Sequence, residues 1–175
     1  AGYVLFYIMI AFSQIYAKSA PTVSEAGYAM GLGFSPQIFT ALLMCSAISL
    51  AITIAISGKY IDIVGRRIWL IWTTFGVAIF GLALPYFLDN GTTTSLFWFL
   101  MIGMGLIGMG YGPLASFLPE LFPTHARYSG ASLTYNISGL FGASVAAIIA
   151  LPLNANYGLK GVGIYLTLNA VLSLI

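Results

Sequence analysis

The chain has 175 residues, of which 60% are hydrophobic and 6% carry a formal charge. A soluble domain usually has about 25% charged residues and needs a polar surface, so this composition fits a protein dissolved in lipid. The net charge of +2 is too small to indicate nucleic acid as a partner. The single cysteine, Cys45, excludes an internal disulfide and a thiolate metal site, and no cofactor is expected.

Long apolar runs follow one another along the chain, and a helix needs about 20 such residues to cross the hydrocarbon layer. The runs at 1–17 and 161–175 are shorter and are expected to be helices cut short by the ends of the sequence. The runs do not alternate apolar and polar residues as barrel strands do, so the expected fold is an all-α membrane protein of six transmembrane helices. Four runs are long enough and contain no charged residue: 36–57, 68–88, 95–116 and 129–153.

The segment from Ser57 to Ile68 contains four of the ten charged residues. A charge at the centre of the bilayer costs about 3 kcal/mol, so this segment is expected to be a loop outside the membrane. Because alternate loops share a side, four Lys and Arg residues fall on the side of this loop and two on the other. The positive-inside rule then places this loop, and both ends of the chain, in the cytoplasm.

The spacing within this loop admits two interpretations. Gly58 and Gly65 permit tight turns, Asp62 suits the positive end of a helix, and Arg66 and Arg67 suit carboxylates or carbonyls. One interpretation is a gating latch. The other is that the two arginines only anchor the chain at the membrane surface.

Two stretches resemble known transporter sequences. GKYIDIVGRR, residues 58–67, resembles the loop between the second and third helices of each half in the major facilitator superfamily, although Ile63 stands where a basic residue is common. GYGPLASFLPELFPTHARYSGASLTYNISGLFGAS, residues 110–144, resembles the signature of the metabolite:proton symporter family. This second resemblance is the more specific one.

The resemblance implies that residues 1–175 are the C-terminal half, helices seven to twelve, of a twelve-helix carrier built from two inverted three-helix repeats. The implied function is proton-coupled symport of a small polar metabolite, an organic acid or an osmolyte, by alternating access across the cytoplasmic membrane. The implied partners are the lipid bilayer, protons and the missing N-terminal six-helix half. The alternative is a half-length scaffold or homodimerising half-carrier without proton coupling, and an enzyme is not expected.

A second cytoplasmic loop contains Glu120 and Arg127, which are expected to pair with each other or with Arg66 and Arg67 in a gating network. The alternative is an exposed loop ion pair worth less than about 1 kcal/mol. No Asp, Glu, Lys, Arg or His falls inside the four long runs. The proton carrier is therefore expected in the missing half.

Four polar residues within the runs are candidates to line a substrate cavity, because a buried polar group needs a partner or water. For the amides the alternative is a hydrogen bond between helices, and for the tyrosines a place in the interfacial belt. The four candidates are Tyr7, Gln14, Tyr135 and Asn136.

Glycines recur at three- and four-residue intervals on one face of the run 95–116, at Gly105, Gly108 and Gly112. Such spacing lets helices pack closely in lipid, and Gly139 belongs to a comparable face on the following run. These smooth faces are expected to serve packing, or to let helices slide and bend during transport.

Overall fold

The computed structural model describes residues 1–174, apart from the side chains of Ala115, Ser116 and Ala147. Ile175, the expected end of the last helix, lies outside the described residues. The elements in chain order are α1 (Gly2–Tyr7), η1 (Ile8–Phe12), α2 (Ser13–Lys18), α3 (Pro36–Val64), α4 (Arg66–Asp89), α5 (Thr93–Glu120), α6 (Arg127–Gly139), η2 (Leu140–Ser144) and α7 (Val145–Leu172).

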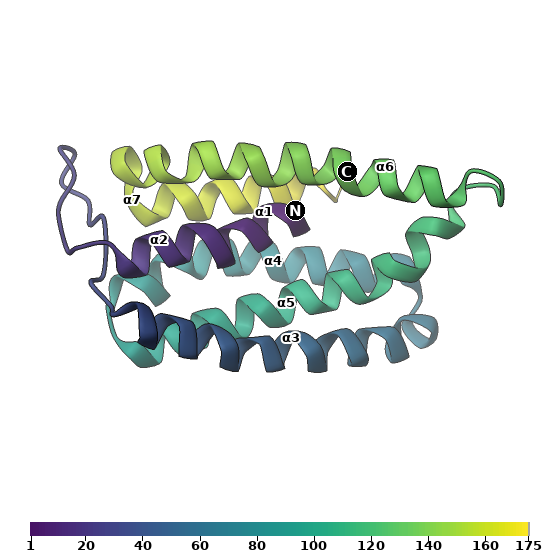
Figure 1. The fold of residues 1–175 in the computed structure, drawn as a ribbon, viewed down its shortest axis with the longest axis horizontal. Helices are drawn as coiled ribbons and strands as arrows, with labels where there is room; N and C mark the ends of the chain where they lie inside the picture. Colours follow the sequence, from purple (N-terminus) through teal and green to yellow (C-terminus); the bar gives the residue numbers. More distant parts are fainter. Residues whose placement is uncertain (175) are drawn as a thin grey trace.

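The first three elements form one continuous helical rod, because the backbone stays helical through Ile8 and Ser13. The η1 segment is a π-helical turn inside this rod. Leu5, Ile8 and Phe12 are almost completely buried, so the rod lies in the middle of the bundle. Figure 1 shows it between α6 with α7 on one side and α5 with α4 on the other.

The α3 helix is longer than the sequence predicted, because it continues past Ser57 to Val64. Its 29 residues span about 43 Å, enough for the hydrocarbon layer and both headgroup regions. A helix forms its own backbone hydrogen bonds both in the hydrocarbon layer and among the headgroups, so leaving the hydrocarbon does not end it. α3 ends at Gly65, whose φ of 94° favours glycine. The loop expected between residues 58 and 67 is therefore a single-residue turn.

Side chains define where α3 and α5 begin. The hydroxyl of Ser35 accepts a hydrogen bond from the amide of Ile38, and Thr92 caps Ser95 in the same way. The gap between the expected helices 68–88 and 95–116 falls between α4 and α5 and includes Gly91, whose φ is 58°.

The gap between the expected helices 129–153 and 161–175 is also shorter in the structure. Asn154 and Asn156 remain helical, and the Asn156 side chain donates a hydrogen bond to the carbonyl of Pro152 at 2.9 Å. The helix departs from helical geometry at Gly158, with φ 67° and ψ −170°. There α7 reverses direction, and residues 159–172 form its second leg, which runs back along the bundle (Figure 1).

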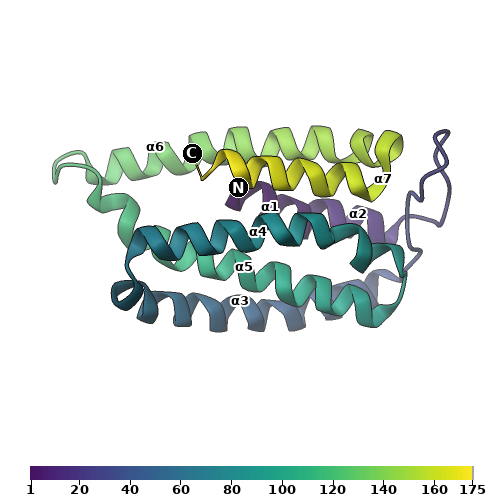
Figure 2. The same ribbon diagram turned by 180° about the vertical axis from the view of Figure 1, so that it is seen from behind.

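Helix packing divides the bundle into two faces. α3 packs chiefly against α5, and α4 packs chiefly against the second leg of α7. Figure 1 presents the face made by α6, the α1–α2 rod, α5 and α3, whereas Figure 2 presents the opposite face, with α4 and the second leg.

Within residues 1–174, four helical stretches are long and apolar enough to cross a membrane. The last of them contains the reversal at Gly158. The four are Pro36–Val64, Arg66–Asp89, Thr93–Glu120 and Arg127–Leu172.

Candidate functional site

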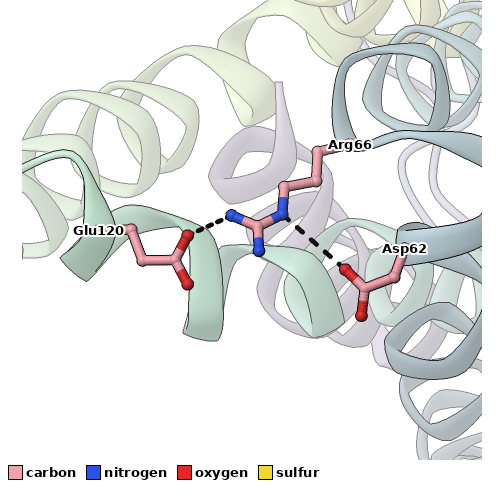
Figure 3. Close-up of polar contacts among 3 residues, drawn as sticks. All are labelled: Asp62, Arg66 and Glu120. Atoms are coloured by element: carbon pink, nitrogen blue, oxygen red, sulfur yellow. Dashed lines mark hydrogen bonds and ion pairs between the residues drawn. The ribbon is translucent and has the colours of Figure 1, made fainter.

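An ion cluster centred on Arg66 joins three helices at one end of the bundle (Figure 3). Arg66 is the first residue of α4, Asp62 lies in the last turn of α3, and Glu120 is the last residue of α5. The Nη1 of Arg66 donates a hydrogen bond to Oε2 of Glu120, while its Nε lies 4.0 Å from Oδ1 of Asp62. One guanidinium therefore contacts carboxylates from two other helices.

The cluster is accessible to solvent. The side chain of Arg66 is 37% exposed, and those of Asp62 and Glu120 are 73% and 52% exposed. The guanidinium also lies over the ring of Phe117, 6.0 Å from its centroid. Exposed ion pairs of this kind contribute little to folding stability.

The structure favours one of the expected pairings. Among the described residues, the ion pairs are those of Arg66 with Asp62 and with Glu120. Arg67 is exposed beside Arg66, and Arg127 begins α6 beyond a short connection that contains the exposed His125.

The two glycines of the predicted loop have different environments. Gly65 makes the turn, whereas Gly58 lies inside α3 with open space around its Cα. The sequence placed Gly58 in a loop, and this is wrong because α3 extends to Val64.

The glycines of α5 lie against α3. A Cβ on Gly108 would meet the hydroxyl of Thr53 and stand 2.7 Å from the carbonyl oxygen of Leu50. A Cβ on Gly112 would meet the hydroxyl of Ser57, and one on Gly105 would stand 3.2 Å from the hydroxyl of Ser49. Only hydrogen fits between these backbones at the closest points.

Hydroxyl groups on α3 hydrogen-bond across the same contact. Ser49 donates to the carbonyl of Met101 at 3.0 Å, and Ser57 donates to the carbonyl of Gly108 at 3.4 Å. The hydrogen bonds of Ser49 and Ser57 to α5 were not predicted from the sequence. The available signal was the four-residue spacing of Ser49, Thr53 and Ser57 in an otherwise apolar helix.

Tyr135 lines a cavity of about 330 Å³ between α1, α5, α6, η2 and α7. Tyr3 and Tyr111 meet edge to face there, with ring centroids 6.0 Å apart. Tyr3 lies close to η2, since a Cβ on Gly142 would be 2.7 Å from the Cβ of Tyr3. The polar side chains that line the cavity are Tyr3, Tyr111, Thr134, Tyr135, Ser138 and Asn169.

The other predicted cavity residues lie apart from this group. Asn136 is exposed on α6 and donates to the carbonyl of Ser132 at 2.8 Å, so the hydrogen bond that the structure describes is within its own helix. Tyr7 is half-buried against the core, and Gln14 is half-buried on α2. Gly139 faces Tyr3, because a Cβ on Gly139 would lie 3.7 Å from the ring of Tyr3.

Among the described side chains, no group of three or more His, Cys, Asp or Glu residues is placed to hold a metal ion.

The apolar helices and the charges gathered at their ends define a multi-pass membrane protein. The chain belongs to the sugar (and other) transporter family, whose model matches residues 26–175. This confirms the expectation of a major facilitator transporter, and the family is one of transporters and not of enzymes.

Several curated proteins are similar to the chain. A Haemophilus influenzae protein whose name assigns it to metabolite transport is 92% identical over all of this chain and 39% of its own length. The inner membrane metabolite transport protein YhjE of Escherichia coli is 39% identical over all of this chain and 38% of its own length. The proline/betaine transporter of Salmonella typhimurium is 31% identical over 69% of this chain and 24% of its own length.

The chain thus spans about two fifths of the length of the relatives that match all of it. No solved structure matches it significantly.

Proposed function

We propose that this chain forms the C-terminal six-helix half of a secondary active transporter that works by alternating access. The α1–α2 rod, α3, α4, α5 and the two legs separated by Gly158 would be the six crossings, arranged as two inverted three-helix repeats. The packing of α4 against the second leg supports this arrangement, because these are the third helices of the two repeats.

The observation on which the mechanism depends is the Arg66 cluster. It joins α3, α4 and α5 at one end of the bundle, through contacts that are too exposed to be needed for folding. Such contacts form and break at low cost. The cluster would therefore stabilise the state in which the passage is closed at this end, and release of Glu120 would accompany opening.

The Arg66 end is the cytoplasmic end in this proposal, since more Lys and Arg residues lie on its side of the membrane. The face that Figure 1 presents, made by α6, the α1–α2 rod, α5 and α3, would then meet the N-terminal half, with the substrate between the halves.

The substrate proposed is a small polar metabolite, and the cavity beside Tyr135 narrows this class. Its described side chains offer hydroxyl and amide groups and include no charged one. Such a lining fits an osmolyte without net charge better than an organic anion, and the names of the proline/betaine relatives agree with this. Proton coupling follows from the resemblance to the metabolite:proton symporters, with the titrating group in the N-terminal half.

The test is uptake of labelled glycine betaine and proline by the full-length protein in vesicles with an imposed proton gradient. We expect accumulation that collapses when a protonophore removes the gradient. Uptake unchanged by the protonophore would rule out proton coupling. If neither osmolyte and no member of a panel of organic acids is taken up, the transport proposal is wrong.

A further inference from the structure

α4 and the second leg of α7 touch backbone to backbone at one point. A Cβ on Gly81 would be 2.9 Å from the carbonyl oxygen of Gly163, and the Thr167 hydroxyl donates to the carbonyl of Ala78 at 3.0 Å. Pro85 has no amide hydrogen, so it donates no helical hydrogen bond to the carbonyl of Gly81 at this crossing. Gly81 and Gly163 thus allow the backbones of the two helices to touch at this crossing.

Beyond this crossing, toward the end of the bundle opposite Arg66, the two helices enclose a groove of about 440 Å³. Pro85 and Tyr86 line it from α4, and Ile164 lines it from α7. Its mouth holds two opposite charges, Asp89 and Lys160, both exposed. Both described ion pairs belong to Arg66, so these two charges do not pair with each other within 4.0 Å.

Exposed apolar side chains continue away from the groove as an apolar stripe along α4 and the second leg, the two helices that lie in front in Figure 2. On α4 the members of this stripe recur at three- and four-residue intervals, from Tyr86 at the groove toward the Arg66 end. Tyr86 is 74% exposed, as suits a ring at the membrane surface. The members on α4 are Tyr86, Leu82, Ile79, Phe75, Trp72 and Ile68, and those on the second leg are Ile164, Leu168 and Leu172.

We propose that this groove binds a phospholipid with a zwitterionic headgroup that carries a primary amine, the chemistry of phosphatidylethanolamine. The ammonium group donates hydrogen bonds to the carboxylate of Asp89, and Lys160 contacts the phosphate. The acyl chains then lie along the apolar stripe, which begins beside the two charges.

The two charges set the headgroup preference. A choline headgroup has the same charges but no N–H donor, so it forms no hydrogen bond with Asp89. A glycerol headgroup has no cation and leaves the negative lipid facing a carboxylate. The order of binding is therefore ethanolamine before choline and glycerol headgroups.

The test is native mass spectrometry of the purified full-length protein after equilibration with equal amounts of the three lipids in detergent. We expect retention of the ethanolamine lipid over the choline lipid by about tenfold, near the lower end of the range for one hydrogen bond to a charged group, because the site is exposed. Equal retention of the two lipids by the unmodified protein would overturn the proposal without any variant.

Variants locate the site. Asp89→Asn should bring retention of the ethanolamine lipid to that of the choline lipid, and Lys160→Gln should weaken retention of both. Glu25→Gln, which removes an exposed acid at the same end, and Lys59→Gln, which removes an exposed base at the other, are matched controls and should change neither. Unchanged preference in Asp89→Asn would place the lipid elsewhere. Because retention is measured without transport, the result is independent of the proposed function.

Discussion

Arg66, at the start of α4, donates a hydrogen bond to Glu120, at the end of α5, across 54 residues of sequence. The same guanidinium lies 4.0 Å from Asp62 at the end of α3. A helix end is the part of a membrane helix that tolerates charge, so three helices can be joined there without placing an ion in lipid. The two carboxylates are not equivalent, because Glu120 accepts a hydrogen bond from Arg66, whereas Asp62 forms only an ion pair with it.

We predict that Glu120→Gln opens the Arg66 end of the transporter more than Asp62→Asn does. The measurement is the rate at which a membrane-impermeant thiol reagent, added on that side, modifies Thr134→Cys in a Cys45→Ser background. Thr134 lines the cavity beside Tyr135, so its reactivity reports access to that cavity. The expected increase for Glu120→Gln is about threefold, with a smaller increase for Asp62→Asn.

The matched control for this prediction is Lys59→Gln, since Lys59 is an exposed charge near the same end of α3. It should leave the rate unchanged. If Glu120→Gln behaves like Lys59→Gln, the ion pair does not hold this end closed.

Gly108→Ala should destabilise the bundle, because the added methyl group meets the Thr53 hydroxyl and the backbone oxygen of Leu50. The Thr53 side chain can rotate away from the added methyl group. The backbone oxygen of Leu50, 2.7 Å from that methyl group, cannot, so α3 and α5 must separate. Overpacking of this kind lowers the free energy of unfolding by about 1–3 kcal/mol. Thermal unfolding in detergent should show a lower midpoint, with little recovery in the double variant that adds Thr53→Ala.

The control for that experiment is Gly58→Ala, in the same helix pair but with nothing within 4 Å of the added Cβ. It should leave the midpoint unchanged or raise it, because alanine favours a helix by about 0.5–1 kcal/mol over glycine. A midpoint lowered equally by both alanines would show that the α3–α5 contact is not as tight as described.

Gly158→Ala should lower the free energy of unfolding by about 1–3 kcal/mol. With φ 67° and ψ −170°, Gly158 occupies a backbone region that is essentially restricted to glycine. The added Cβ also meets the Tyr28 ring, at 2.6 Å from its Cδ1. Because the strain is in the backbone, adding Tyr28→Ala should not restore stability, whereas full restoration would assign the loss to the ring contact alone.

Apolar runs predicted where the chain is helical because lipid leaves the backbone no partner other than itself. They placed the start of α3 and both ends of α4 within two residues, but not the C-terminal ends of α3 and α5. Turn-forming residues such as Asn156 remain helical, because the side-chain amide of Asn156 finds a hydrogen-bond acceptor in its own helix, the carbonyl of Pro152. Two of the turns fall instead at Gly65 and Gly158, where φ is positive. Helix ends outside the hydrocarbon layer leave no signal in hydropathy.

Contacts between charged residues could be predicted from the sequence, because charges collect at the helix ends. Contacts that depend on how the helices pack could not. Charge placement brought Arg66 and Glu120 into one expected group, and the structure selects that pair over Glu120 with Arg127. Asn136 was expected to line a cavity or to bond to another helix. Its side chain is exposed, and the hydrogen bonds described for its amide go to Ser132 of its own helix, so cavity lining in the full-length carrier stays a prediction. The position of a polar residue within a span does not reveal which neighbour covers it.

Accessibility of the cavity beside Tyr135 from each side of the membrane tests alternating access most directly. In the full-length protein carrying Thr134→Cys and Cys45→Ser, a membrane-impermeant thiol reagent is added to one side or the other, with and without a saturating osmolyte. We expect modification from both sides, and a saturating osmolyte should raise the rate from one side while it lowers the rate from the other. Modification from one side only, or rates from both sides that rise and fall together, would contradict alternating access.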